Sequence, residues 1–305
     1  MNSNQQLSRE DNPVPTASEL VSDDIGVSTN NDHPNSVLGK AELILAAFRS
    51  GPLHMRLTEL SQRSGVPKAS VYRLAQEMTA LGLLDRVDDG YQLGLTMFEL
   101  GQRVPIAAVL RSIARPFMSD LYFQTKGVVH LSVLDGTHVL YVEKVGAGAG
   151  TAREFSDVGR RFPASCTASG KLLLACGTES SQILGSMTDA DLFTPTNVSV
   201  TSTKELQRQL AVVRELGFAI EHHETIPGWS GLAAPIRSHG GEVYAAVAVA
   251  VPSQQLAVPR TLPLVQQAAR QISSLVGDWL MRHGTSAVQF SAGRTIVRQV
   301  VQEAS

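Results

Sequence analysis

Residues 57–93 constrain the fold most strongly, because two short helical patterns joined by a glycine–proline turn lead into a β-hairpin. The turn is Gly65-Val66-Pro67, and its proline suits the first turn of a helix expected over residues 67–80. Two short strands are expected around Asp88-Asp89-Gly90. With an earlier helix that ends at Ser50-Gly51-Pro52, this order predicts a winged helix-turn-helix. The apolar positions that define its helices are Leu38, Ala41, Ile44, Leu45, Phe48, Leu57, Leu60, Val71, Leu74, Ala75 and Met78.

The predicted second helix of the motif carries basic and polar residues on the face opposite its apolar stripe. The segment 61–76 holds three basic residues and no acidic one. Such a helix fits the major groove, where Arg and Gln read base edges and Lys and Ser bind phosphates. We therefore expect contacts to double-stranded DNA from one set of residues: Arg63, Lys68, Ala69, Ser70, Tyr72, Arg73 and Gln76, with Arg86 from the wing. The alternative is a solvated helix in a winged helix that binds proteins.

A single winged helix makes few phosphate contacts, so useful affinity calls for a dimer on a palindromic operator. The net charge of −2 seems to disfavour DNA, but it averages unlike segments. Residues 1–34 carry six acidic residues and one basic residue, whereas the other 271 residues carry 25 basic and 22 acidic ones. We expect 1–34 to be a disordered acidic tail ahead of a mildly basic protein.

The rest of the chain predicts an antiparallel sheet with helices, and hence an α+β fold. Two linker helices, interrupted near Pro105 and Pro116, are expected to precede a hairpin around Asp135-Gly136. Helices are expected over 167–176, 203–216 and 262–281, and strands over 219–224, 231–237 and 242–251. The expected divisions are a tail (1–34), a winged helix-turn-helix domain (35–97), linker helices (98–122), a C-terminal domain (123–283) and a second tail (284–305).

Other classes of protein fit the composition poorly. The two cysteines are too few for a disulfide scaffold or a four-thiolate zinc site. No secretory signal is seen, and the longest apolar run, Val243–Pro252, is about half the length of a membrane span. We expect a cytoplasmic protein with no membrane contact, no cofactor and no metal. The neighbouring side chains of His222-His223-Glu224 would point to opposite faces of a strand, which argues against a shared metal site. The glycines of 146–150 lack the spacing of a dinucleotide-binding loop.

Five stretches carry a resemblance to a known family: LTELSQRSGVPKASVYRLAQEMTALGLL with GYQLG, LSVLDGTHVLYVEKV, GRRFPASCTASGKLLLA, ELGFAIEHHETIPGWSGLAAP and GGEVYAAVAVAVP. Over about residues 35–282 the chain resembles the IclR family of bacterial transcriptional regulators. The resemblance implies a winged helix-turn-helix, a linker helix and a GAF-like effector-binding domain. It also implies a homodimer or a dimer of dimers that regulates a catabolic operon for small organic acids or aromatic compounds.

The resemblance also implies where an effector binds. Ala168 and Ser169 match positions whose backbone N–H groups bind an effector carboxylate, as expected at a helix N-terminus. Glu221 matches an acidic position of the pocket. Gly231 stands where many members have Cys, whereas Ala248 and Ala250 stand where some have Ser. Together with Trp229, Phe155 and Phe162, these differences predict a roomier and more apolar pocket, suited to an aromatic or otherwise bulky carboxylate.

The alternative is that Trp229 and Phe162 are ordinary core residues and that the two alanines only pack the sheet. Ser165 stands where family members often have His, so a role for that His is not carried over. The expected function is transcriptional repression, with activation as the alternative. An enzyme that acts on the ligand through Cys166 or Glu221, and a winged helix that binds only proteins, are the other classes; we expect no enzyme.

Overall fold

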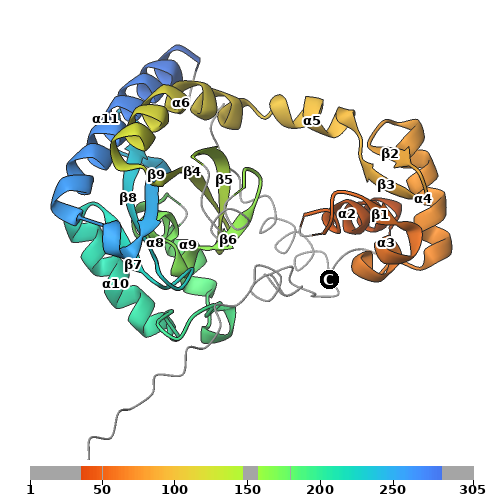
Figure 1. The fold of residues 1–305 in the computed structure, drawn as a ribbon, viewed down its shortest axis with the longest axis horizontal. Coiled ribbons are helices and arrows are strands. Elements are labelled where there is room, and N and C mark those ends of the chain that lie inside the picture. Colours follow the sequence, from red (N-terminus) through yellow and green to blue (C-terminus); the bar gives the residue numbers. More distant parts are fainter. Residues whose placement is uncertain (1–35, 50, 147–156, 179, 284–305) are drawn as a thin grey trace, which may run out of the picture.

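The computed structural model describes residues 36–49, 51–146, 157–178 and 180–283. It has the predicted α+β class, with a winged helix-turn-helix at one end and a sheet domain at the other (Figure 1). The expected tails 1–34 and 284–305 lie outside the described residues, as do Phe155 and most of the glycine-rich loop.

The N-terminal unit is built from three helices, α2 (Val37–Ala46), α3 (Leu57–Ser64) and α4 (Lys68–Ala80). The hairpin strands β2 (Leu84–Val87) and β3 (Gly90–Leu93) form the wing. A short strand that was not predicted, β1 (Met55–Arg56), completes a sheet of order β1-β3-β2.

Leu38 departs from the apolar face predicted for the first helix, because its side chain is exposed. Helix α2 contacts the core further along, where Ile44 is fully buried. The predicted stripe of the second motif helix is present, since Val71, Leu74 and Met78 are buried in the same core.

Two helices connect the N-terminal unit to the sheet domain: α5 (Leu95–Gln102) and α6 (Pro105–Thr125) (Figure 1). Helix α6 begins at Pro105 as predicted, but it continues through Pro116, so the interruption predicted there is wrong. Ala114 and Met118, one on each side of the proline, are buried against the sheet. Their burial offsets the roughly 3 kcal/mol that an internal proline costs a helix.

The C-terminal sheet has six strands in the order β6-β5-β4-β9-β8-β7, and each neighbouring pair is antiparallel. The strands are β4 (Val128–Asp135), β5 (His138–Val145), β6 (Arg161–Pro163), β7 (Ala219–His222), β8 (Trp229–Arg237) and β9 (Val243–Pro252). Strand β6 was not predicted. The hairpin at Asp135-Gly136 is present, and Gly136 has a φ of +61° that favours glycine in the turn.

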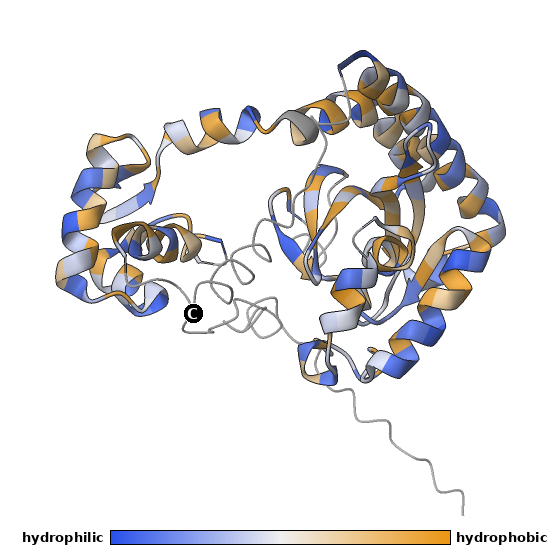
Figure 2. Ribbon diagram, turned by 180° about the vertical axis from the view of Figure 1, so that it is seen from behind, coloured by the Kyte–Doolittle hydropathy of each residue, from blue (hydrophilic) through white to orange (hydrophobic). Residues whose placement is uncertain are grey.

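Helices cover both faces of this sheet (Figures 1 and 2). Helices α6 and α11 (Val258–His283) pack on one face, and α8 (Ala168–Cys176) and α10 (Thr203–Leu216) pack on the other. Helix α9 (Ser180–Ser186), which was not predicted, lies next to α8. No described helix is long and apolar enough to cross a membrane.

Successive residues of the strands alternate between these two layers. In β4, Val129 and Leu131 belong to the core under α6 and α11, so His130 and Ser132 face the α8 side. A β-bulge interrupts the pairing of β4 with β5: Ser132 pairs with Tyr141 and Leu131 with Glu143, which leaves Val142 as an extra residue.

Candidate effector pocket and DNA-binding surface

The DNA-contact residues predicted on α4 lie on its exposed side. Lys68, Ala69, Tyr72, Arg73 and Gln76 are exposed, and Ser70 is half-buried. Gly65 supplies the turn before this helix with a φ of +67°. The structure therefore presents one polar helix face, and its contacts to DNA stay a prediction.

Local interactions order several of these side chains. Arg73 forms an ion pair with Glu77 at 2.8 Å between Nη1 and Oε1, and the Gln76 amide donates to the Tyr72 hydroxyl at 2.9 Å. On the wing, the Arg86 guanidinium lies over the Tyr91 ring at 6.0 Å from its centroid. Arg63 lies at the end of α3 and pairs with Glu59 of the preceding turn. The side chains are held near the surface by weak pairs that DNA phosphates can replace.

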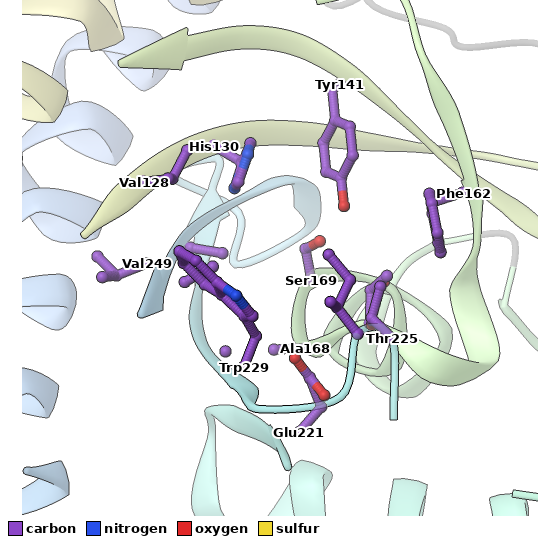
Figure 3. Close-up of a pocket in the computed structure, with 15 residues that line it drawn as sticks. Val128, His130, Tyr141, Phe162, Ala168, Ser169, Glu221, Thr225, Trp229 and Val249 are labelled. Atoms are coloured by element: carbon purple, nitrogen blue, oxygen red, sulfur yellow. The ribbon is translucent and has the colours of Figure 1, made fainter. Parts of the chain in front are cut away.

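A cavity of about 60 Å³ lies between the sheet and α8 (Figure 3). By this measure a water molecule needs about 10–15 Å³, so the cavity has room for more than one water molecule. The cavity is mainly apolar. Its lining includes every described residue that we predicted for the effector: Phe162, Ala168, Ser169, Glu221, Trp229, Gly231, Ala248 and Ala250. Whether these residues bind an effector stays a prediction.

The N-terminus of α8 supplies hydrogen-bond donors to the cavity. Thr167 caps the helix by accepting the Gly170 N–H at 3.0 Å. Within the described part of the chain, the N–H groups of Ala168 and Ser169 donate to no other group, and both residues line the cavity. Two free amides and the positive end of the helix dipole favour an anion here.

The floor of the cavity is formed by residues that pair with one another across three neighbouring strands, and two of these residues are small. Ala250 of β9 pairs with Gly231 of β8, which in turn pairs with Glu221 of β7. A Cβ atom at Gly231 would lie 3.2 Å from Glu221 Oε1 and 3.4 Å from the Ala168 Cβ. The glycine thus lets the carboxyl and α8 approach each other, and a larger residue would narrow the cavity.

Glu221 is the buried carboxyl of the cavity. Its Oε2 accepts the backbone N–H of Glu224 at 3.0 Å. Burial raises the pKa of Glu221 to about 8, although the Glu224 N–H and the Lys171 ammonium lower it. Behind it, the buried Lys171 forms an ion pair with Glu224 and donates to Gln209 at 2.7 Å. The Glu221 carboxyl is therefore mostly protonated at neutral pH, which suits it to a site for anions.

Sequence reasoning missed several lining residues, which are Val128, His130, Tyr141, Thr167, Thr225, Ile226 and Val249. The alternation of HLSVLDG, residues 130–136, places His130 and Ser132 on one face of a strand, but it does not say what packs there. That information depends on the register of β4 against β9, which pairs His130 with Ala248. The β-bulge at Val142, which separates Tyr141 from Glu143, also leaves no sequence signal.

The structure offers little support for catalysis through Cys166. Its thiol is buried, donates to the Pro163 carbonyl at 3.4 Å, and does not line the cavity. Burial raises the pKa of this thiol, which keeps it in the protonated form that is a poor nucleophile. The described residues contain no cluster of three or more side chains suited to a metal ion, His222 and His223 included.

A winged helix-turn-helix unit joined to a separate domain with a mainly apolar cavity defines a class: a DNA-binding regulator that responds to a small molecule. Two family models match the chain, Bacterial transcriptional regulator IclR C-terminal over residues 105–274 and IclR helix-turn-helix domain over residues 37–88. The chain belongs to the IclR family of bacterial transcriptional regulators, and it is a DNA-binding transcriptional regulator with a C-terminal effector-binding domain.

Characterised relatives agree with this assignment. The chain is 32% identical to the transcriptional regulator KdgR of Escherichia coli K12, over 72% of this chain and 85% of that protein. It is 28% identical to KipR of Bacillus subtilis, over 80% of this chain and 98% of that protein. Among solved structures, an IclR homologue from Microbacterium hydrocarbonoxydans complexed with 4-hydroxybenzoate matches with a TM-score of 0.70 and 28% identity, covering 79% of this chain and 99% of that one.

Proposed function

We propose that this regulator represses a catabolic operon and that its effector is an aromatic or otherwise bulky carboxylic acid bound in the cavity beside α8. One observation carries the proposal: an apolar cavity has two free N–H groups at one end. The amides of Ala168 and Ser169 suit a carboxylate, and the floor of Ala250 and Gly231 suits a flat ring. The solved relative with bound 4-hydroxybenzoate shows that an IclR homologue accepts such a molecule.

The proposed active form is a homodimer, or a dimer of dimers, on a palindromic operator. The connecting helix α5 and the start of α6 support it, because Leu95, Phe98, Leu100 and Val104 are exposed apolar residues along this connection. A second copy would cover them. The proposed response is that effector binding shifts α6 and so changes the spacing of the two α4 helices. Such a shift requires different effector affinities in the two states.

A panel of acids tests the effector class. We expect benzoate-type and other bulky carboxylates to raise the unfolding temperature of the protein, and Trp229→Ala to reduce this effect while leaving DNA binding by the empty protein intact. Lactate, pyruvate and glyoxylate serve as small aliphatic acids in the same panel. Stabilisation by these small acids alone would contradict the proposal.

The sign of regulation needs a separate measurement. Fluorescence anisotropy with DNA from the region upstream of the regulator's own gene gives the operator affinity with and without effector, and a transcription assay gives the output. We expect the bound regulator to lower transcription and the effector to release it from DNA. Higher transcription from the bound operator would establish the activator alternative instead.

A further inference from the structure

His130 lines the cavity with a ring nitrogen that has no partner. Its side chain is buried on β4, and its Nε2 atom makes no hydrogen bond within the described residues. The hydroxyl of Ser132, two residues along the same face of the strand, is also buried without a partner. Buried polar side chains are almost always hydrogen-bonded, so an unpartnered imidazole facing a cavity indicates a group that bonds a ligand.

The fold fixes the position and charge of this imidazole. Its ring packs against Tyr141 on the next strand, with 4.7 Å between ring centroids. Ala248, its partner on β9, is too small to reach across and cover the ring. Burial, with a smaller effect of Lys144, lowers the pKa of His130 to about 3. The neutral ring offers one N–H donor and one acceptor, which suits a hydroxyl group better than a second carboxylate.

The two polar ends of the cavity come from different layers. The amides of Ala168 and Ser169 belong to α8, whereas His130 belongs to the sheet on which α8 packs (Figure 3). The floor between them is apolar, with Ala250 and Gly231 at its centre. A flat ring with a carboxylate at one end and a hydroxyl at another position would satisfy both ends together.

We propose that His130 is a specificity-determining residue whose Nε2 hydrogen-bonds a ring hydroxyl, so the preferred effector is a hydroxylated aromatic carboxylate. This inference rests on the proposed function and narrows its effector class. In this proposal strand β4 recognises the hydroxyl group of the effector, whereas helix α8 binds its carboxylate.

Calorimetric binding of benzoate and of 2-, 3- and 4-hydroxybenzoate to the full-length protein tests the proposal. We expect one hydroxybenzoate to bind at least about tenfold more tightly than benzoate, because a site built to hydrogen-bond a hydroxyl rejects the analogue without it. His130→Phe should reduce this preference to less than about twofold. His138→Phe, the same change at a histidine on β5 outside the cavity lining, should keep the wild-type preference.

The outcomes separate this inference from the proposed function. Equal wild-type affinities for benzoate and all three hydroxybenzoates would overturn the role of His130 and leave the aromatic effector standing. If only small aliphatic acids such as lactate, pyruvate and glyoxylate bind, the proposed effector class is wrong and the role of His130 falls with it. If Tyr141→Phe loses the preference for hydroxybenzoate over benzoate while His130→Phe keeps it, the tyrosine and not His130 contacts the hydroxyl. This result would overturn the role proposed for His130.

A spectroscopic measurement on the wild-type protein needs no folded variant at position 130. With ¹⁵N-labelled histidine and sequential resonance assignment, the His130 signals are expected not to titrate between about pH 5 and 8. We expect hydroxybenzoate, and not benzoate, to shift the Nε2 signal. A shift of equal size with both ligands contradicts the proposal.

The unfolding temperature distinguishes a ligand contact from a structural role. Because His130 Nε2 bonds nothing in the empty protein, His130→Phe should leave the unfolding temperature unchanged or raise it. A marked fall would show that the imidazole supports the fold, and would count against a residue kept for the ligand.

Discussion

Arg73 is the α4 side chain best placed to read a base edge. It is exposed, and it pairs with Glu77, which lies one turn away on the same exposed helix face. A surface pair of this kind contributes about 0.3–0.5 kcal/mol to stability, whereas a bidentate contact to guanine discriminates by about 1–3 kcal/mol. We therefore expect the guanidinium to matter far more to DNA affinity than to folding.

We predict that Arg73→Ala weakens operator binding by roughly 5- to 150-fold, as measured by fluorescence anisotropy, because about 1–3 kcal/mol of base discrimination is lost. The unfolding temperature should change by less than about 2 °C. Arg208→Ala removes a similarly exposed, ion-paired arginine from α10 and should leave DNA binding unchanged. Wild-type operator affinity in Arg73→Ala would show that α4 does not read the operator.

The titration of Glu221 makes the free energy of unfolding depend on pH. In the unfolded chain the carboxyl ionises near 4.5, whereas in the folded protein burial raises its pKa to about 8. Between these values the folded state binds more protons than the unfolded state, so this residue makes stability fall as pH rises. Each unit of pH across this window costs up to about 1.4 kcal/mol. Glu221→Gln should flatten the dependence of the unfolding temperature between pH 5 and 8.

The same titration predicts that carboxylate effectors bind less tightly above about pH 8. Glu221 is then ionised and repels the anion, whereas Glu221→Gln should bind with little pH dependence. Calorimetry at pH 6.5 and pH 9 measures the difference for both proteins. An equal fall in affinity in both would place the titrating group elsewhere.

Among the elements, α8 depends on one glycine that packs against backbone. A Cβ atom at Gly170 would lie 2.3 Å from the Ala164 carbonyl oxygen, in the 3₁₀ turn Ala164–Cys166 that precedes the helix. Backbone cannot rotate away as a side chain can, so the helix or the turn must move. Either movement displaces the free amides of Ala168 and Ser169.

Gly170→Ala should therefore destabilise the protein by about 1–3 kcal/mol or more and weaken carboxylate binding. In Gly185→Ala, within α9, the added Cβ meets nothing within 4 Å, so the better helix propensity of alanine should stabilise by up to about 1 kcal/mol. Thermal unfolding and effector titration of both variants measure the contrast. Equal effects in the two variants would contradict the close packing seen at Gly170.

The predicted elements show what local sequence determines. The exposed face of α4 follows from the 3.6-residue period, because Val71, Leu74 and Met78 require burial on the other side. The continuation of α6 through Pro116 could not be predicted locally, because it depends on burial of Ala114 and Met118 against a distant sheet. The pocket residues near α8 came from the family motif, whereas His130 and Tyr141 depend on strand register.

For the molecule as a whole, the β-bulge at Val142 joins the cavity to the linker. Tyr141, before the extra residue, lines the cavity, whereas Glu143, after it, faces the opposite layer. There the buried Glu143 carboxylate accepts from Arg111 Nε and Arg115 Nη1 of α6, each at 3.4 Å. On β5, Tyr141 thus lines the cavity, and Glu143, two residues further on, contacts the helix that leads to the DNA-binding unit.

We predict that Glu143→Gln retains effector affinity within about threefold but reduces the effect of effector on operator affinity, since coupling of this kind is worth about 1–3 kcal/mol. Loss of the charged hydrogen bonds should lower stability by about 1–2 kcal/mol. Arg208→Gln, which removes an exposed ion pair from α10, is the control. A full effector response in Glu143→Gln would show that the signal reaches α6 by other contacts.

The short side chains on the cavity floor have a consequence for the evolution of this regulator. Gly231, Ala248 and Ala250 lie on the sheet face that α6 does not touch. Adding atoms at these positions would reshape the ligand space and leave the linker and α4 intact. Sensors for other metabolites can therefore arise by a few substitutions in the floor, each inheriting the existing operator, and the same positions are where a designed biosensor should be varied first.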